Sequence, residues 1–98
     1  MPDKAMQELC RVVAALRHPR EVADFLRALL TPAERARIIL RWRLVCLLEA
    51  GMKQRAIADK LGISLCKITR GSRELKHGPP CFRDHVRKSN QQGKEGPP

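Results

Sequence analysis

Apolar residues recur at helical spacing along much of this 98-residue chain. Residues 9–16 and residues 22–30 each carry them in the i, i+3, i+4 pattern that predicts an amphipathic helix. His18 and Pro19 separate the two segments. No stretch of the sequence alternates apolar and polar residues as a half-buried strand would, and no internal repeat is present. The pattern therefore predicts an all-α fold.

A third helix is predicted to begin at Thr31. Thr31 can cap this helix, Pro32 suits its first position, and Glu34 can complete a capping box. Gly51 is expected to end the helix, because glycine commonly follows the last helical turn. Apolar residues between positions 38 and 48 cover more than one face, so we expect this helix to be buried from several sides.

The helical pattern stops at the sequence Gly78-Pro79-Pro80. Residues 81–88 are predicted to add a short helix. Residues 89–98 contain no apolar side chain to anchor them, and we expect them to form a disordered tail. The folded domain is accordingly predicted to span residues 1–88.

The chain is strongly basic, with 20 Lys and Arg against 10 Asp and Glu and a net charge of +10. Residues 51–77 hold seven basic and two acidic side chains. Such a concentration favours a nucleic-acid partner, because neutralised phosphates release counterions and thereby drive association. The alternative is that the charge only keeps a small domain in solution.

Other classes of protein are less favoured by the sequence. The four cysteines and three histidines lack metal-ligand spacing, so no metal or cofactor is expected. No carboxylate pair, nucleophile–base arrangement or phosphate-binding loop indicates an enzyme. The N-terminus does not resemble a signal peptide, and the longest strongly apolar stretch, residues 44–48, is too short to span a bilayer. A cytoplasmic protein without a membrane partner is expected.

The segment QRAIADKLGISLCKI, residues 54–68, has the spacing of a helix-turn-helix, a motif that we place at about residues 53–76. Gly62 accommodates the turn, Ser64 is placed to cap the second helix, and Ala58 is small enough for that helix to approach. Aliphatic residues occupy the expected core positions, namely Ile57, Leu61, Ile63 and Ile68.

The second helix of such a motif enters the major groove of DNA by its N-terminal end. Three residues there are nearest the base edges, a threonine lies near the backbone, and two residues that open the first helix are placed for phosphate or base contact. The candidate DNA-binding residues are Leu65, Cys66, Lys67, Thr69, Gln54 and Arg55. Four further basic residues are assigned to general electrostatics: Lys53, Lys60, Arg73 and Lys76.

Gly71 lies inside the predicted second helix, where a glycine costs about 1 kcal/mol relative to alanine. It follows Ile68 by three residues and so lies on the inner side of that helix. One explanation is close packing of another part of the backbone. The other is that a flat apolar ligand lies on the glycine, beside Arg70, which could clamp a carboxylate and stack on a ring.

The motifs LLTPAERA, RWR, QRAIADKLGIS and ITRGSRELK, between Leu29 and Lys76, closely resemble the bacterial tryptophan operon repressors. The resemblance implies an interwoven all-helical homodimer that binds L-tryptophan as corepressor. The liganded dimer would then occupy a palindromic operator in double-stranded DNA and control genes for tryptophan biosynthesis or uptake.

The resemblance also implies a ligand site shared between two subunits. Arg41 and Arg70 would sandwich the indole against Gly71, and Arg70 would hold the carboxylate together with the Thr31 hydroxyl. Backbone carbonyls around Ala28 and Leu30 would receive the ammonium group.

The chain departs from the family pattern at several positions. Glu74 replaces a second serine, and its carboxylate could pair with the ligand's ammonium or be held by Arg70 or Arg73. Cys66 and Lys67 replace small and hydroxylic residues at the groove-facing end, which alters the expected operator preference. The main alternative is a ligand-independent helix-turn-helix regulator. A basic RNA-binding or structural protein is a second alternative, although two Phe and no Tyr offer few platforms for stacking bases.

Overall fold

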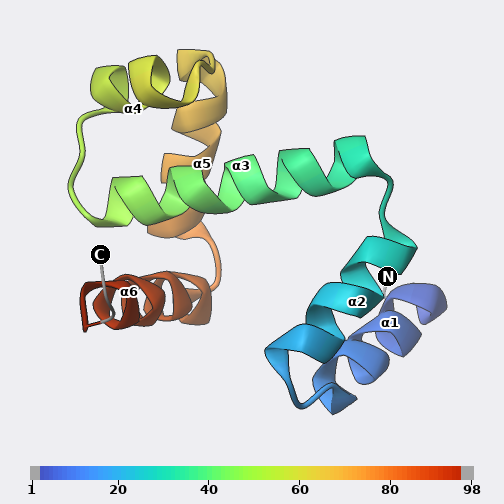
Figure 1. Ribbon diagram of the computed structural model, residues 1–98. Helices are drawn as coiled ribbons and strands as arrows, with labels where there is room; N and C mark the ends of the chain where they lie inside the picture. Colours follow the sequence, from blue (N-terminus) through green and yellow to red (C-terminus); the bar gives the residue numbers. More distant parts are fainter. Residues whose placement is uncertain (1–2, 96–98) are drawn as a thin grey trace. The chain divides into compact units, whose positions relative to one another are not determined.

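The computed structural model describes residues 3–95, with side chains to residue 92, and is helical throughout that range apart from short connections (Figure 1). The helices are α1 (Lys4–Ala15), α2 (Pro19–Leu29), α3 (Pro32–Glu49), α4 (Gln54–Leu61), α5 (Leu65–His77) and α6 (Pro80–Glu95). The described residues contain no strand, which confirms the all-α prediction. The chain divides into two units, one ending at Ala36 and one beginning at Arg37.

The helices of the first unit begin at side-chain caps. Asp3 Oδ1 accepts a hydrogen bond from Ala5 N at 3.0 Å, and His18 Nδ1 accepts one from Arg20 N at 3.0 Å. His18 and Pro19, which interrupt the sequence pattern, therefore start α2. Neither α1 nor α2 contains a buried residue, so these helices form no core of their own within the described part of the chain.

The predicted capping box at the start of α3 is confirmed. Glu34 N donates to Thr31 Oγ1 at 3.2 Å, and Thr31 N donates to Glu34 Oε1 at 2.9 Å. Gly51 follows the helix with φ +96°, a conformation that L side chains rarely adopt. Met52 N reaches back to Leu47 O at 3.1 Å, which completes the glycine-dependent helix end.

The second unit contains the core, which is built by the C-terminal half of α3 together with α4 and α5. Leu44, Ile57 and Ile68 are buried there, and Met52, Leu61 and Ile63 are among the partly buried residues that pack against them. In Figure 1, α4 and α6 lie on opposite sides of the C-terminal half of α3. The burial of Ile57 and Ile68 and the packing of Leu61 and Ile63 against them confirm the core positions predicted for the helix-turn-helix.

The prediction of a short helix over residues 81–88 followed by a disordered tail is wrong for the described residues. Helix α6 starts at Pro80 and continues to Glu95, while residues 96–98 lie outside the description. Val86 is fully buried, and Asn90 Nδ2 donates to Cys46 O at 3.0 Å. The Asn90 hydrogen bond ties the polar residues after Ser89 to a distant part of the chain, although these residues include no apolar anchor of their own.

Candidate ligand cavity and nucleic-acid interface

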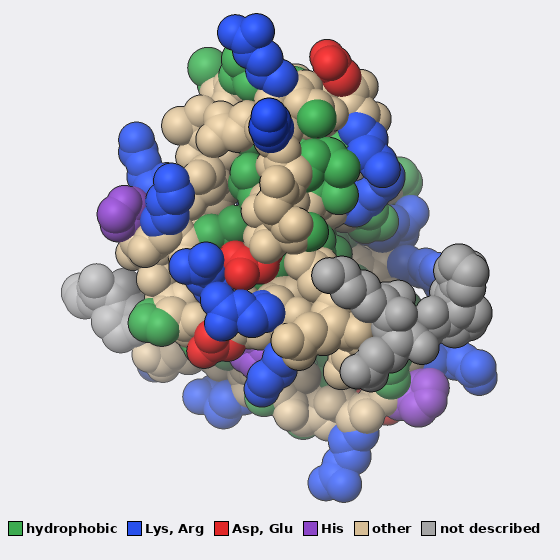
Figure 2. All heavy atoms as spheres, turned by 90° about the vertical axis from the view of Figure 1, so that its left-hand side faces the viewer, with side chains coloured by type: hydrophobic (Ala, Val, Ile, Leu, Met, Phe, Trp, Pro, Cys, Tyr) green, Lys and Arg blue, Asp and Glu red, His purple; other side chains and the backbone are tan. Residues whose placement is uncertain are grey.

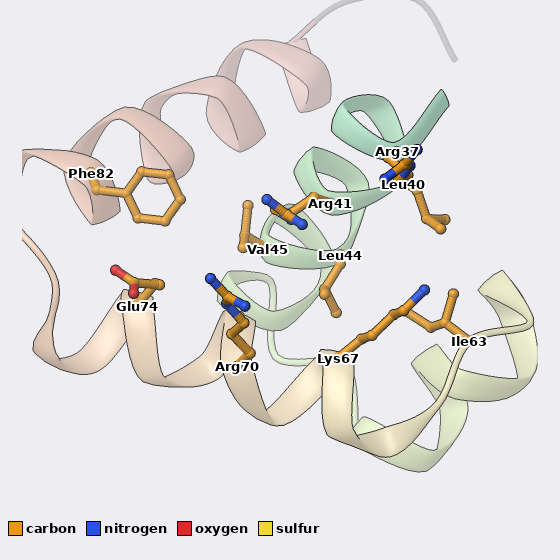
Figure 3. Close-up of a pocket in the computed structure, with 11 residues that line it drawn as sticks. Arg37, Leu40, Arg41, Leu44, Val45, Ile63, Lys67, Arg70, Glu74 and Phe82 are labelled. Atoms are coloured by element: carbon orange, nitrogen blue, oxygen red, sulfur yellow. The ribbon is translucent and has the colours of Figure 1, made fainter. Parts of the chain in front are cut away.

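A cavity of about 520 Å³ lies in the second unit, between α3, α5 and α6 (Figure 3). Its lining combines four basic side chains, one acidic side chain, a glycine and an apolar wall. These residues are Arg37, Arg41, Lys67, Arg70, Glu74, Gly71, Leu40, Leu44, Val45, Ile63 and Phe82. The cavity can therefore receive a ligand that is partly apolar and carries a negative charge.

The α5 contribution to the cavity follows from helical geometry. Lys67, Arg70, Gly71 and Glu74 occupy positions i, i+3, i+4 and i+7, so they lie on one side of this helix. Ser64 Oγ accepts from Lys67 N at 3.4 Å and caps α5 as predicted. This single stripe brings charged and small residues together from a short sequence.

Gly71 allows α5 to approach α3 closely. A Cβ atom at this position would lie 3.2 Å from Leu44 Cδ2 and 3.5 Å from Leu48 Cδ1. Leu44 is only 3% exposed, so it has little room to move away. The space beside Gly71 is thus filled by leucine side chains of α3 rather than by a backbone, and the glycine also lines the cavity.

The charges in the cavity are unbalanced. Its four basic groups, on Arg37, Arg41, Lys67 and Arg70, face a single carboxylate, Glu74. None of these five side chains makes a hydrogen bond or an ion pair with another described residue. The ion pairs among the described residues join Arg83 and Arg87 to Glu49, outside the cavity. The cavity is therefore positively charged and open to an anionic group.

Four of the six predicted tryptophan-binding residues line this one cavity: Arg41, Arg70, Gly71 and Glu74. The other two, Leu30 and Thr31, belong to the first unit and are not part of the lining. Thr31 Oγ1 already accepts the Glu34 N–H, but its own hydroxyl proton remains able to donate. Whether these residues bind the amino acid stays a prediction.

The structure adds Arg37, Lys67 and Phe82 to the cavity. Helical spacing could have found the first two, because Arg37 precedes Arg41 by one turn and Lys67 precedes Gly71 by one turn. Phe82 had no such signal, since it comes from α6, which packs on α5 through contacts that the local sequence does not encode.

The helix-turn-helix consists of α4, the connection at Gly62 and α5. Gly62 has φ +65°, the left-handed conformation that a glycine adopts most readily. Gln54 and Arg55 are exposed in the first turn of α4, and Leu65 and Cys66 are exposed in the first turn of α5. Figure 2 shows that Lys and Arg side chains are more frequent than Asp and Glu on the face that it displays.

Two of the predicted DNA-binding residues also contribute elsewhere in the structure, one to the cavity lining and one to a hydrogen bond within α5. Lys67 lies on the cavity side of α5, about half a turn around the helix from Leu65. Thr69 Oγ1 donates to Leu65 O at 2.9 Å, so its proton is used within the helix. A hydrogen bond from this hydroxyl to a phosphate oxygen would require the internal bond to break.

Helix α6 is tied to the end of α3 by a pair of charge-assisted hydrogen bonds. Arg83 Nε donates to Glu49 Oε1 at 2.8 Å, and Arg87 Nε donates to Glu49 Oε2 at 3.3 Å. The Glu49 side chain is 10% exposed, whereas both arginine side chains are 50% exposed. These two hydrogen bonds hold α6, and with it Phe82, against the end of α3. Elsewhere on α3, burial raises the pKa of the Cys46 thiol.

The arrangement of α4, Gly62 and α5 defines a helix-turn-helix protein of the DNA-binding regulator class. A family model described as Trp repressor protein matches residues 4–90, and the chain belongs to this family. The family consists of regulatory DNA-binding proteins, and this chain is accordingly a Trp-repressor-like regulator of transcription. No helix within the described residues is both long and apolar enough to cross a membrane.

The chain is similar to several proteins that are named Trp operon repressor homolog. It is 30% identical to the one from Chlamydia trachomatis serovar L2 over 87 residues, which cover 88% of this chain and 93% of the relative. It is 36% identical to the one from Chlamydia caviae, with 86% and 81% covered. It is 46% identical to the one from Mannheimia succiniciproducens, with 66% and 65% covered. No solved structure matches the chain significantly.

Proposed function

We propose that the protein is a tryptophan-dependent repressor that occupies a palindromic operator when L-tryptophan is bound. The observation that supports this most directly is the cavity, which brings Arg70 and Gly71 of α5, the helix that follows the turn, together with Arg41 of α3. An amino acid in this cavity would contact the same helix that approaches the DNA. The controlled genes would be those for tryptophan biosynthesis or uptake, and the protein would act in the cytoplasm.

The cavity offers complementary groups for each part of a zwitterionic aromatic amino acid. The indole would lie between Arg41 and Arg70, since guanidinium planes stack on aromatic rings. The carboxylate would be held by Arg70 and the ammonium group would pair with the Glu74 carboxylate. Leu30 and Thr31 would be supplied to this site by a second chain.

A homodimer is supported by the apolar surface that the chain leaves exposed. Helices α1 and α2 bury none of their residues, and Met6 and Leu29 are more than half exposed. On α3, Ile39 is 58% exposed and Trp42 is 41% exposed, although the sequence pattern favours burial of this helix from several sides. Interweaving with a second copy would cover these surfaces.

The mechanism that we propose is a change in the position of α5. Without ligand, the two recognition helices of a dimer would sit too close together or be too mobile to enter successive major grooves. Tryptophan between Arg41 and Arg70 would hold α5 outward from α3. Ligand and operator would then each increase the affinity of the other, as thermodynamic linkage requires.

Calorimetry tests the ligand assignment. L-tryptophan is titrated into the protein, with L-phenylalanine and indole-3-propionate as comparators for the ring and for the ammonium group. We expect saturable heat at one tryptophan per chain and its loss in Arg70→Ala. Arg73→Ala is the matched control, because Arg73 is an exposed arginine on α5 that does not line the cavity. Unchanged tryptophan affinity in Arg70→Ala would refute the pocket assignment.

Fluorescence anisotropy of labelled palindromic duplexes tests the coupling to DNA. We expect tryptophan to increase the affinity of the native protein for its operator, while Arg70→Ala retains only salt-dependent non-specific binding. Equal operator affinity with and without tryptophan would instead identify a ligand-independent regulator. The filling of the space beside Gly71 by Leu44 and Leu48 is the observation that favours this second candidate.

A further inference from the structure

Two basic side chains of the cavity, Arg37 and Lys67, lie at one end of it. Figure 3 shows them beside Leu40 and Ile63, whereas Glu74 and Phe82 lie at the other end. Arg37 comes from α3 and Lys67 from the first turn of α5, so two separate elements of the second unit place a charge at this end of the cavity. The proposed tryptophan site, centred on Arg41 and Arg70, assigns no role to either of them.

The two charges lack an internal counterion. Neither side chain makes an ion pair or a hydrogen bond within the described residues. Among the lining residues that the structure describes, Glu74 is the only one with a carboxylate, and it lies at the opposite end (Figure 3). Two positive charges at the same end of a partly enclosed cavity repel each other. An anion placed between them is attracted by both and offsets that repulsion.

The chemistry of the two groups points to an oxyanion with several oxygens. A guanidinium group offers a planar pair of N–H donors to two oxygens, and an ammonium group adds three donors and a concentrated charge. Together they match a tetrahedral phosphate group better than a single carboxylate, which Arg70 alone can satisfy.

We propose that Arg37 and Lys67 form a second anion site, which holds one phosphate-type oxyanion next to the Arg41–Arg70 site. Two sources carry this chemistry. A DNA backbone phosphate can reach the site because Lys67 belongs to the first turn of α5, the end of the helix that approaches the groove. Free phosphate can reach it because the cavity is open and has a volume of about 520 Å³. The site does not depend on tryptophan being the corepressor.

The DNA arm of the test measures how the affinity for a fixed duplex varies with KCl concentration. In a logarithmic plot, each neutralised phosphate contributes a slope of about 0.9. For the double variant Arg37→Gln/Lys67→Gln we expect the slope to fall by about 0.9 per bound chain, because both side chains share one phosphate. A fall of about 1.8 would mean two independent surface contacts and would overturn the proposal.

The free-anion arm compares melting temperatures in potassium phosphate and potassium chloride at equal ionic strength. Phosphate stabilises many proteins non-specifically, so the informative quantity is the difference between native protein and double variant. A larger phosphate-induced rise in the native protein supports the site with free phosphate as its ligand, even if the DNA slope is unchanged. No difference in either arm would overturn the proposal.

The matched control is the double variant Lys60→Gln/Lys76→Gln, which removes the same net charge from exposed positions of the second unit outside the cavity. We expect it to respond to phosphate as the native protein does. Tryptophan titrations separate this proposal from the corepressor proposal. If the native protein binds tryptophan, Arg37→Gln/Lys67→Gln should weaken that binding much less than Arg70→Ala does, and an equal loss in both variants would overturn the division into two sites. If the native protein binds none, both phosphate arms still decide the matter.

Discussion

Gly71→Ala tests whether the contact between α3 and α5 requires a glycine. Two effects oppose each other in this substitution. Alanine favours the helix by about 0.8–1.0 kcal/mol relative to glycine. The added methyl group, however, would lie 3.2 Å from Leu44 Cδ2, which is tighter than ordinary van der Waals contact. Leu44 is itself enclosed by Ile57 and Ile68, both of them fully buried, so it can yield only by disturbing the core.

The contact distances decide the sign of the expected change. Leu44 must move by a few tenths of an ångström, and Leu48, at 3.5 Å from the new methyl group, limits the opposite movement. Overpacking of a well-filled core typically costs about 1–3 kcal/mol. After subtraction of the gain in helix propensity, we expect Gly71→Ala to lower the free energy of unfolding by about 1 kcal/mol.

The assay is urea denaturation followed by circular dichroism, at one protein concentration because a dimer's stability depends on concentration. Leu44→Val supplies the second arm of a double-mutant cycle, since it removes volume where the methyl group is added. We expect the double variant to be more stable than the sum of the single effects predicts, by about 1 kcal/mol. A stabilised Gly71→Ala protein, or strictly additive effects, would refute the packing argument.

Three further outcomes follow from the contacts of individual side chains. Glu49→Gln should lower the free energy of unfolding by about 1 kcal/mol in urea titrations, a modest value because the arginine partners are half exposed, and an unchanged midpoint would contradict this. Thr31→Ala should cost about 1 kcal/mol through loss of the cap, whereas Thr31→Ser should cost much less, and equal losses would argue against the hydroxyl. Because burial raises the pKa of Cys46, its thiolate fraction is reduced at any given pH, so iodoacetamide should modify it later than the three exposed cysteines as pH rises. Equal rates for all four thiols, measured by mass spectrometry, would contradict that order.

Helices with local signals could be predicted from the sequence, and one without them could not. The capping box at Thr31 and the glycine at position 51 determine the two ends of α3, and each of these signals lies within a few residues of the helix end that it determines. Beyond Ser89, by contrast, α6 is held by Asn90, which contacts Cys46 O, more than forty positions earlier. A contact of this kind depends on the completed fold, and the polar composition of the segment gives no sign of it.

The candidate site shows the same division between local and distant information. Arg70, Gly71 and Glu74 share one helical stripe, and the resemblance to known repressors implies Arg70 and Gly71 as ligand contacts, with Glu74 in place of the family's second serine. The position of Lys67 near the start of α5 predicts a DNA contact, which stays a prediction, but position along the helix axis does not determine the face on which a residue lies. Its angular position places it in the cavity. The contribution of Phe82, which comes from α6, could be found only from the tertiary structure.

The exposed apolar surface and the absence of Leu30 and Thr31 from the cavity lining have a common explanation in the proposed homodimer. A unit whose helices bury no residue cannot offset the conformational entropy of its own folding, so α1 and α2 need a surface to pack on. Leu30 and Thr31 follow directly on α2, and they are the predicted ligand contacts that the cavity lining lacks. If a second chain provides the surface that folds this unit, the same association delivers Leu30 and Thr31 to the partner's cavity. Assembly and completion of the site would then be one event, and tryptophan would bind only the assembled form and stabilise it by mass action.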